Sequence, residues 1–256
     1  MRLTYDFGKI GLSIRQSKIF HLNIRNLISR QILKGQRVVI AVDGGRTKIR
    51  INKKGRKNSK TNRHGFIGEW VDNTVLTIYV VDENGKKIKN SEIPVTNDGT
   101  YEDYQGFLKI LEMHLIDLGI NQAKQVLLVA DGAEWIWKHI PPLLKKLGCP
   151  SSTYQLLDFY HATEHLQSFA EASFLNEAER KTWFKQARSA LKKGKINTLL
   201  KDMNQLSLNC SGKRRKILDK EINYFLKGDK EGRLNYHKVS SLKLPIGSGA
   251  VESLIR

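Results

Sequence analysis

The stretch that decides the fold is QRVVIAVDGG, residues Gln36 to Gly45. Its run of β-branched apolar residues predicts a buried strand that ends in an Asp-Gly-Gly turn. A second stretch, KQVLLVADGA (Lys124 to Ala133), repeats the pattern and also ends in Asp-Gly. Apolar runs of this kind are typical of central strands, whose two faces are both covered. We therefore expect two adjacent central strands that end in Asp43 and Asp131.

The segments around these strands predict the rest of the fold. Residues 69–99 indicate two strands joined at a turn at Asn84-Gly85, and residues 100–119 have the apolar spacing of an amphipathic helix. A helix from Glu134 and a short strand in STYQLLDFYH (152–161) follow. The order β-β-β-α-β-α-β is that of an α/β fold of the RNase H-like class, a mixed sheet flanked by helices.

The same pattern divides the chain into four parts. Residues 1–36 form a basic helical segment, and residues 37–161 form the RNase H-like core. Residues 162–240 lack strand signals and predict an all-α insertion. Residues 241–256, with the glycine-rich LPIGSGAVES, are expected to return the chain to the sheet edge and to begin a further core helix.

The charge of the chain indicates its partner. There are 44 Lys and Arg against 25 Asp and Glu, a formal net charge of +19. Residues 46–64 hold nine Lys or Arg and no acid, which predicts a basic loop directly after Asp43. A field of this sign attracts polyanions, so we expect binding to DNA that weakens strongly with salt. No apolar run reaches the length of a membrane span or a signal peptide, so the expected location is the cytoplasm.

The paired aspartates point to metal chemistry. Parallel neighbouring strands would hold Asp43 and Asp131 at one sheet edge, where like charges repel unless a cation lies between them. Carboxylate oxygens suit Mg²⁺ or Mn²⁺, and a site with two such ions needs a third acid. Glu252, in the helix start that follows the helical region, is the candidate because it completes the order Asp, Asp, Glu.

Four motifs carry a resemblance to a known family. AVDGGR, LLVADGAEWIW, LLDFYHATEHL and LPIGSGAVES occur in this order. Together they resemble the DDE transposases of bacterial insertion sequences, in the branch with a helical insertion before the last acid. The resemblance implies a retroviral-integrase-like core in which Asp43, Asp131 and Glu252 bind two Mg²⁺ ions. It also implies cleavage and transfer of DNA strands at the element ends, in the bacterial nucleoid.

Further roles follow from the same resemblance. Asp158 and His161 match an Asp-x-x-His pair that orients the site or contacts DNA, and Arg46 would reach a phosphate. Relatives extend beyond the last acid and carry an N-terminal DNA-recognition domain, so we expect a chain truncated at both ends. Whether it acts as a homodimer or a higher oligomer on DNA stays open. The basic run supplies the expected DNA-binding residues Lys48, Arg50, Lys53, Lys54, Arg56 and Lys57.

Three other interpretations remain. A nuclease or junction resolvase on the same fold would use the same site chemistry, and a non-catalytic remnant would bind DNA only. The sequence HATEH (161–165) also matches the H-x-x-E-H pattern of inverted zinc peptidases, with His161 and His165 as ligands and Glu164 as base. That motif leaves the basic charge and the two aspartates unexplained. For EWIWKHI, we expect Trp135 to pack into the core.

Overall fold

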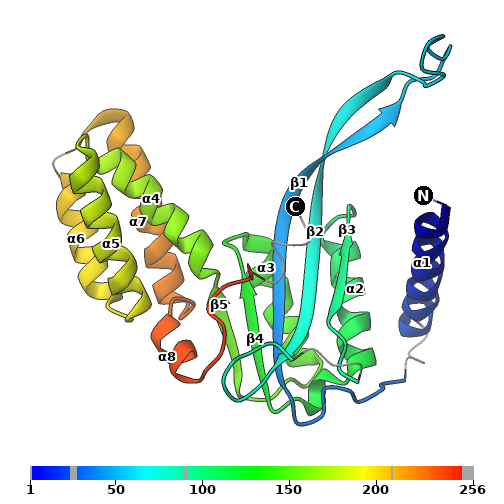
Figure 1. The fold of residues 1–256 in the computed structure, drawn as a ribbon. Helices are drawn as coiled ribbons and strands as arrows, with labels where there is room; N and C mark the ends of the chain where they lie inside the picture. Colours follow the sequence, from blue (N-terminus) through cyan, green and yellow to red (C-terminus); the bar gives the residue numbers. More distant parts are fainter. Residues whose placement is uncertain (1, 24–27, 89–91, 209, 250–256) are drawn as a thin grey trace.

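The computed structural model describes residues 2–23, 28–88, 92–208 and 210–249, and its centre is a mixed five-stranded sheet. The strand order is β3-β2-β1-β4-β5. β1 pairs antiparallel with β2 and parallel with β4, β2 pairs antiparallel with β3, and β4 pairs parallel with β5. With helices on its sides, this sheet has the predicted RNase H-like architecture (Figure 1). The strands are β1 (Arg37–Asn52), β2 (Phe66–Val81), β3 (Thr96–Thr100), β4 (Gln125–Ala130) and β5 (Thr153–Leu157).

Helices cover the sheet and extend beyond it. Between the strands lie α2 (Tyr104–Leu118), a short 3-10 helix (Ile120–Gln122) and α3 (Glu134–Lys146). The N-terminal helix is α1 (Arg2–Asn23), which lies along α2 (Figure 1). After β5 the chain is helical, as the sequence predicts, and α4 packs against both α5 and α7. These later helices are α4 (Phe159–Ser173), α5 (Glu177–Lys192), α6 (Ile196–Leu208), α7 (Gly212–Lys230) and α8 (Tyr236–Ser241).

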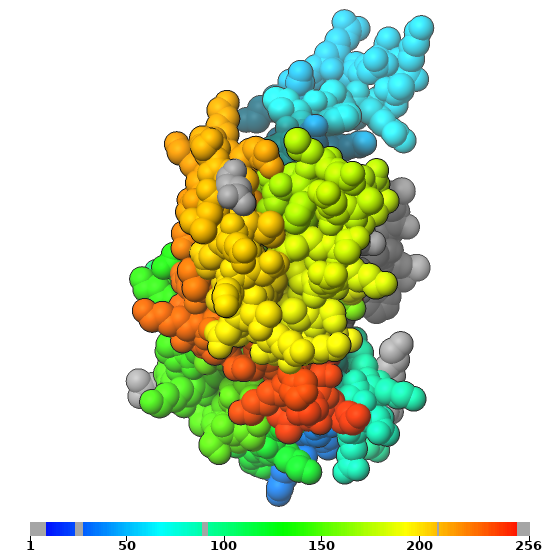
Figure 2. Space-filling model, turned by 90° about the vertical axis from the view of Figure 1, so that its left-hand side faces the viewer, coloured from blue at the N-terminus to red at the C-terminus, as the bar shows by residue number. Residues whose placement is uncertain are grey.

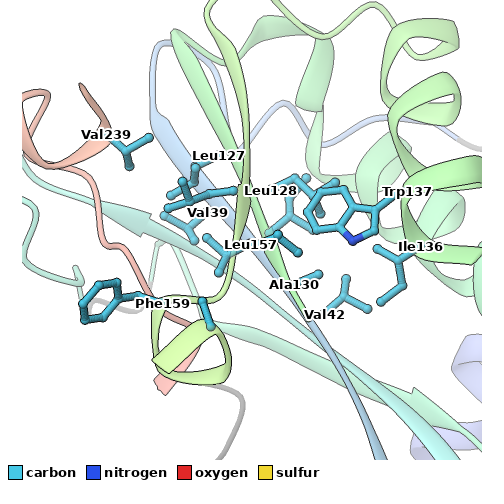
Figure 3. Packing of buried hydrophobic residues seen from close by; sticks show 14 of the residues in the cluster. Val39, Val42, Leu127, Leu128, Ala130, Ile136, Trp137, Leu157, Phe159 and Val239 are labelled. Carbon is cyan, nitrogen blue, oxygen red and sulfur yellow. The ribbon is translucent and has the colours of Figure 1, made fainter. Parts of the chain in front are cut away.

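The two faces of the sheet meet different helices. Val42 points toward Trp137 of α3, whereas Val39 points to the opposite side, where Val239 of α8 lies (Figure 3). All of these side chains are buried, Trp137 at 8% exposure being the most open. Because side chains alternate along a strand, Asp43 lies on the same face as Val39. The first aspartate therefore faces the α8 side of the sheet, away from α3.

The basic loop expected after Asp43 is instead part of a long β-hairpin. β1 does not end at Asp43 but continues to Asn52, and it pairs with β2 from Arg37↔Val81 to Asn52↔Phe66. Neither Gly44 nor Gly45 has a positive φ, so both glycines stay extended and the strand runs on. Residues 47–51, TKIRI, have the period-two alternation of a strand, and this alternation prevails over the Gly-Gly break signal.

The outer half of this hairpin leaves the body of the molecule. β4 pairs with β1 only as far as Val42↔Ala130, and β3 pairs with β2 only from Thr74↔Thr100. Beyond these pairs, residues 45–52 and 66–73 pair only with each other, and residues 53–65 form the tip. We call residues 44–73 the arm. It projects past the other elements in both views (Figures 1 and 2).

The N-terminal segment is held to α2 by one buried acid. Asp117 is 3% exposed and accepts hydrogen bonds from Lys18 Nζ at 2.7 Å and from Arg30 Nη2 at 2.5 Å. Burial opposes its ionisation, but the hydrogen bonds from Arg30 and Lys18 prevail and lower the pKa of Asp117. These contacts fix the segment before β1 to the core. Within the described ranges, no helix has the length and apolar character needed to cross a membrane.

Gly119 ends α2 in a conformation and a space that only glycine fits. Its φ is +80°, and an added Cβ would lie 2.9 Å from the backbone Cα of Gln31. Gly148 has a similar φ of +76°, but its nearest neighbour, Asn121 Cβ, lies at 3.6 Å. We expect Gly148→Ala to lower the free energy of unfolding by about 1 kcal/mol and Gly119→Ala by about twice that, since only the latter adds a backbone clash. Urea titration of both variants measures the difference, and equal losses would contradict it.

Candidate active site at the sheet edge

Three acidic residues stand at the sheet edge where the parallel pairing of β1, β4 and β5 ends. Asp43 stands one residue beyond the Val42↔Ala130 pair, and Asp131 directly follows Ala130. Asp158 directly follows β5, and its backbone N–H donates to the carbonyl of Ala130 at 2.7 Å. The fold thus brings Asp43 and Asp131 together as the sequence predicts. Asp43 does so from the middle of a strand, because β2 continues to pair with it at Val75.

The pKa of Asp43 reflects its burial and its acidic neighbours. Burial, and secondly the charge of Asp131, raise the pKa of Asp43 from 3.8 to about 6. Asp158 acts in the same direction, whereas a hydrogen bond from the Gly44 backbone and the nearby His161 act against it. A carboxylate whose ionisation is opposed by burial and by its acidic neighbours is a group that a bound cation would stabilise.

Asp131 is held by its own loop. Its Oδ1 accepts from the backbone N–H of Ala133 at 2.8 Å, and its carbonyl accepts from Trp137 Nε1 at 2.8 Å. These bonds fix the turn between β4 and α3 and leave Oδ2 without a described partner. Trp137 is the more deeply buried tryptophan of EWIWKHI, and Trp135 packs against the core as expected. Trp135 is only partly buried, edge-on to Phe107 at 5.5 Å between ring centroids.

Asp158 is buried and connects three parts of the chain. It is 3% exposed, and its Oδ1 accepts from the backbone N–H groups of Tyr160 at 2.6 Å and His161 at 3.0 Å, which makes it the N-cap of α4. Its Oδ2 accepts from the backbone N–H of Ser248. The carbonyl of Ile246 accepts from the N–H of Phe159 at 3.0 Å. Asp158 thus secures the segment that holds Ile246 and Ser248 against the sheet edge.

Glu252, the expected third acid, lies outside the described residues. The segment that leads to it does reach the site, since Gly247 lies against the ring of Tyr160 and Ser248 binds Asp158. Among the described residues, no group of three His, Cys, Asp or Glu side chains is placed to hold a metal ion. Asp43 and Asp131 fit a divalent cation, because they are hard oxygen donors whose like charges repel each other without one. A complete ligand set needs at least one more group.

The helical insertion adds a cluster that the sequence motifs did not reveal. Tyr224 of α7 stacks on His165 with 3.7 Å between ring centroids, and His165 Nδ1 lies 2.5 Å from Oε2 of the buried Glu221. Burial first, then the charges of Asp131 and Asp158, raise the pKa of Tyr224. One signal was present in the sequence. Glu221 stands in the apolar stripe of α7 formed by Leu218, Ile222 and Phe225, and a buried acid there requires a partner.

The two glycines next to the aspartates serve different purposes. An added Cβ at Gly44 would meet nothing within 4 Å, so this position is open. An added Cβ at Gly132 would lie 3.0 Å from Cε2 of Tyr224. The space beside Gly44 is therefore free, whereas the aromatic ring of Tyr224 takes up the space beside Gly132.

The HATEH motif forms local contacts on α4. His161 Nδ1 lies 3.2 Å from Glu164 Oε2, and the rings of His161 and His165 are edge-to-face with 5.0 Å between their centroids. The second histidine is engaged by Glu221 as described above. In the portion of the chain that the structure describes, the motif has no third ligand, so nothing there supports a zinc site.

The predicted DNA-contacting residues lie along the arm. Arg46, Lys48 and Arg50 alternate on β1, and all three are exposed. Arg46 Nε lies 3.1 Å from Asp72 Oδ1 across the hairpin. The remaining four, Lys53, Lys54, Arg56 and Lys57, are exposed at the tip.

Comparisons with known proteins add little to this description. Neither the comparison with protein families nor that with curated proteins gives a match. Among solved structures, the Drosophila P element transposase strand transfer complex is similar at 14% sequence identity and a TM-score of 0.23. That alignment covers 84% of this chain, which spans 63% of the length of that chain. A similarity at this level carries no argument, and the fold assignment rests on the sheet topology.

Proposed function

We propose that this chain is the catalytic part of a transposase of the DDE type, which cleaves DNA and transfers its strands with the help of Mg²⁺ or Mn²⁺. The observation that carries the proposal is that Asp43 and Asp131 both stand just beyond the Val42↔Ala130 pair, close enough for the charge of Asp131 to raise the pKa of Asp43. Asp43, Asp131 and Glu252 would hold two ions. When bound, such ions activate the attacking hydroxyl and stabilise the leaving 3′ oxygen.

The residues around the aspartates prepare the site for this role. The N–H of Ala133 binds one oxygen of Asp131, so the turn between β4 and α3 holds this carboxylate in place. Asp158 binds the backbone of Ser248, four residues before Glu252 in the sequence, and so holds the segment from which the third acid follows. We assign Asp158 a positioning role, because its oxygens are occupied by backbone N–H groups.

The net charge of +19 and the exposed basic arm support DNA as the substrate. The expected setting is bacterial nucleoid DNA, and element-end sequences would be the specific sites. A nuclease or resolvase on the same fold shares the metal chemistry, but it would cleave without joining strands. A strand-transfer product is the outcome that separates the two functions.

The test is cleavage of supercoiled plasmid DNA by the purified chain. With Mg²⁺ or Mn²⁺ we expect nicked product whose new ends carry a 3′-hydroxyl, and with EDTA we expect none. Asp131→Asn prepared in the same way controls for contaminating nuclease, because its fold is retained while a ligand is lost. Nicking that proceeds in EDTA, or that is equal in Asp131→Asn, would remove the proposed function.

A further inference from the structure

The arm has two chemically different faces. Because side chains alternate along both strands, one face collects the basic and aromatic residues, and we call it the aromatic-basic face. The register places Lys48 opposite Trp70 and Arg50 opposite Gly68 on this face. The opposite face is mainly apolar and holds Thr47, Ile49, Ile51, Ile67, Glu69 and Val71. The aromatic-basic face consists of Arg46, Lys48, Arg50, Asn52, Phe66, Gly68, Trp70 and Asp72.

Large aromatic rings lie open to solvent on the aromatic-basic face. Trp70 is 55% exposed and Phe66 is 51% exposed, and neither contributes to the hydrophobic core. Each ring has a cation over it. Lys48 Nζ lies 5.7 Å from the ring centroid of Trp70, and Arg50 Cζ lies 4.5 Å from that of Phe66. These rings therefore contact cationic side chains and remain accessible to a ligand.

Gly68 separates the two rings. It lies between Phe66 and Trp70 on the same face of β2, and these two residues are about 13 Å apart along the strand. An added Cβ at Gly68 would lie 2.3 Å from Cε of Lys48, so the lysine side chain occupies the space that the glycine leaves. The face thus places the cations of β1 beside the aromatic rings of β2.

This combination of exposed rings and cations suits one class of ligand. Proteins bind unpaired nucleic-acid strands by stacking bases on aromatic rings while Lys and Arg contact the phosphates. A duplex keeps its bases stacked inside and gives exposed rings no such partner. The absence of acids among residues 46–64, which hold nine basic residues, favours a polyanion over a protein surface.

We propose that the aromatic-basic face of the arm binds single-stranded or locally unpaired DNA, with Trp70 and Phe66 stacking on bases and Lys48 and Arg50 contacting phosphates. This inference rests on the proposed function and specifies the form of its DNA substrate. β1 links the two sites directly, because Lys48 follows Asp43 by about 17 Å of extended strand. A DNA strand that is unpaired at Asp43 and Asp131 would be within reach of the arm.

The experiment measures binding of labelled oligothymidylate and of a duplex of equal length by fluorescence anisotropy in EDTA. We expect Trp70→Ala to weaken binding of the single strand by roughly 5- to 150-fold, with little change for the duplex. Trp70→Phe should recover most of the loss, because a ring is restored. Ile67→Ala is the matched control, since Ile67 is similarly exposed, at 56%, on the apolar face of the same strand.

Two results would overturn the proposal. One is unchanged affinity of Trp70→Ala for the single strand, and the other is an equal loss for single strand and duplex. A dimer seen by sedimentation that dissociates in Ile67→Ala, together with unchanged DNA binding in Trp70→Ala, would assign the arm to a second copy of this chain. Because EDTA removes divalent metal ions from the binding assay, these outcomes do not depend on DNA cleavage. Failure of cleavage in the wild-type protein would reject the proposed function and leave the binding data valid.

Discussion

Asp43→Asn is expected to abolish metal-dependent DNA cleavage and to make the protein more stable at neutral pH. The amide keeps the size of the side chain but removes a charge that a divalent cation requires, so we expect the cleavage rate to fall by about a thousandfold or more. The same charge is unfavourable in the folded protein without metal, because burial and Asp131 raise its pKa to about 6. Nicking assays and thermal melts in EDTA measure the two effects.

The raised pKa of Asp43 determines how the free energy of unfolding changes with pH. Below about pH 3.8, Asp43 is protonated in both the folded and the unfolded state and contributes nothing. Between about pH 4 and 6 the folded state holds the proton more tightly, so the free energy of unfolding falls as the pH rises. Above pH 6 the charge of Asp43 lowers the free energy of unfolding by its full amount. The shift corresponds to about 3 kcal/mol, which solvent screening at this half-buried site reduces to about 1 to 2 kcal/mol.

Asp43→Asn should therefore raise the melting temperature at pH 7.5 but not at pH 3.5. Divalent cations should stabilise the wild-type protein and have less effect on the variant, since binding to the folded state alone stabilises it. Asp229→Asn, an exposed substitution on α7, is the control and should change neither cleavage nor the pH profile. A variant that is less stable than the wild type at pH 7.5 would show that the Asp43 charge is already compensated within the chain.

Asp158→Ala is expected to cause the largest loss of stability among these substitutions. The buried carboxylate accepts three backbone hydrogen bonds, from Tyr160, His161 and Ser248. Removing it leaves these donors without their acceptor and also removes the N-cap of α4. We expect a loss of about 3 kcal/mol, and a fall in melting temperature of about 6 to 12 °C in a chain of this size.

The control for Asp158 is another N-cap. Asn176 caps α5 by accepting from the N–H groups of Ala178 at 2.8 Å and Glu179 at 3.3 Å, but it holds no distant segment. Asn176→Ala should cost only about 1 kcal/mol. Hydrogen exchange should show a second difference, because only Asp158→Ala releases the N–H of Ser248. Similar costs for the two variants would mean that the link to Ser248 contributes little.

The sequence predicted the elements whose signal is local. β-branched apolar runs identified β1 and β4, and the spacing of Phe107, Leu111, Leu115 and Leu118 with Gly119 identified α2. The adjacency of Asp43 and Asp131 followed from the rule that parallel strands end at one sheet edge. These features depend on periodicity and turn chemistry, which a single sequence displays directly.

The features that the sequence did not predict depend on distant partners. The arm was missed because Gly44-Gly45 indicated a turn, although the alternation of Ile49 and Ile51 with basic residues was already that of a strand. The contact of Tyr224 with Gly132 joins α7 to the loop after β4, and no local pattern encodes it. Trp137 is buried in preference to Trp135 because its indole N–H reaches the carbonyl of Asp131.

The glycine pair at the root of the arm has a mechanical consequence. Gly44 and Gly45 follow Asp43 at the point where the neighbouring strands β4 and β3 stop supporting the hairpin. Glycine has the softest backbone of any residue, so bending of the ribbon concentrates there. Asp43 lies on the rigid side of this hinge, between paired strands. We expect the arm to bend at Gly44-Gly45 relative to the sheet, while the carboxylate of Asp43 stays fixed.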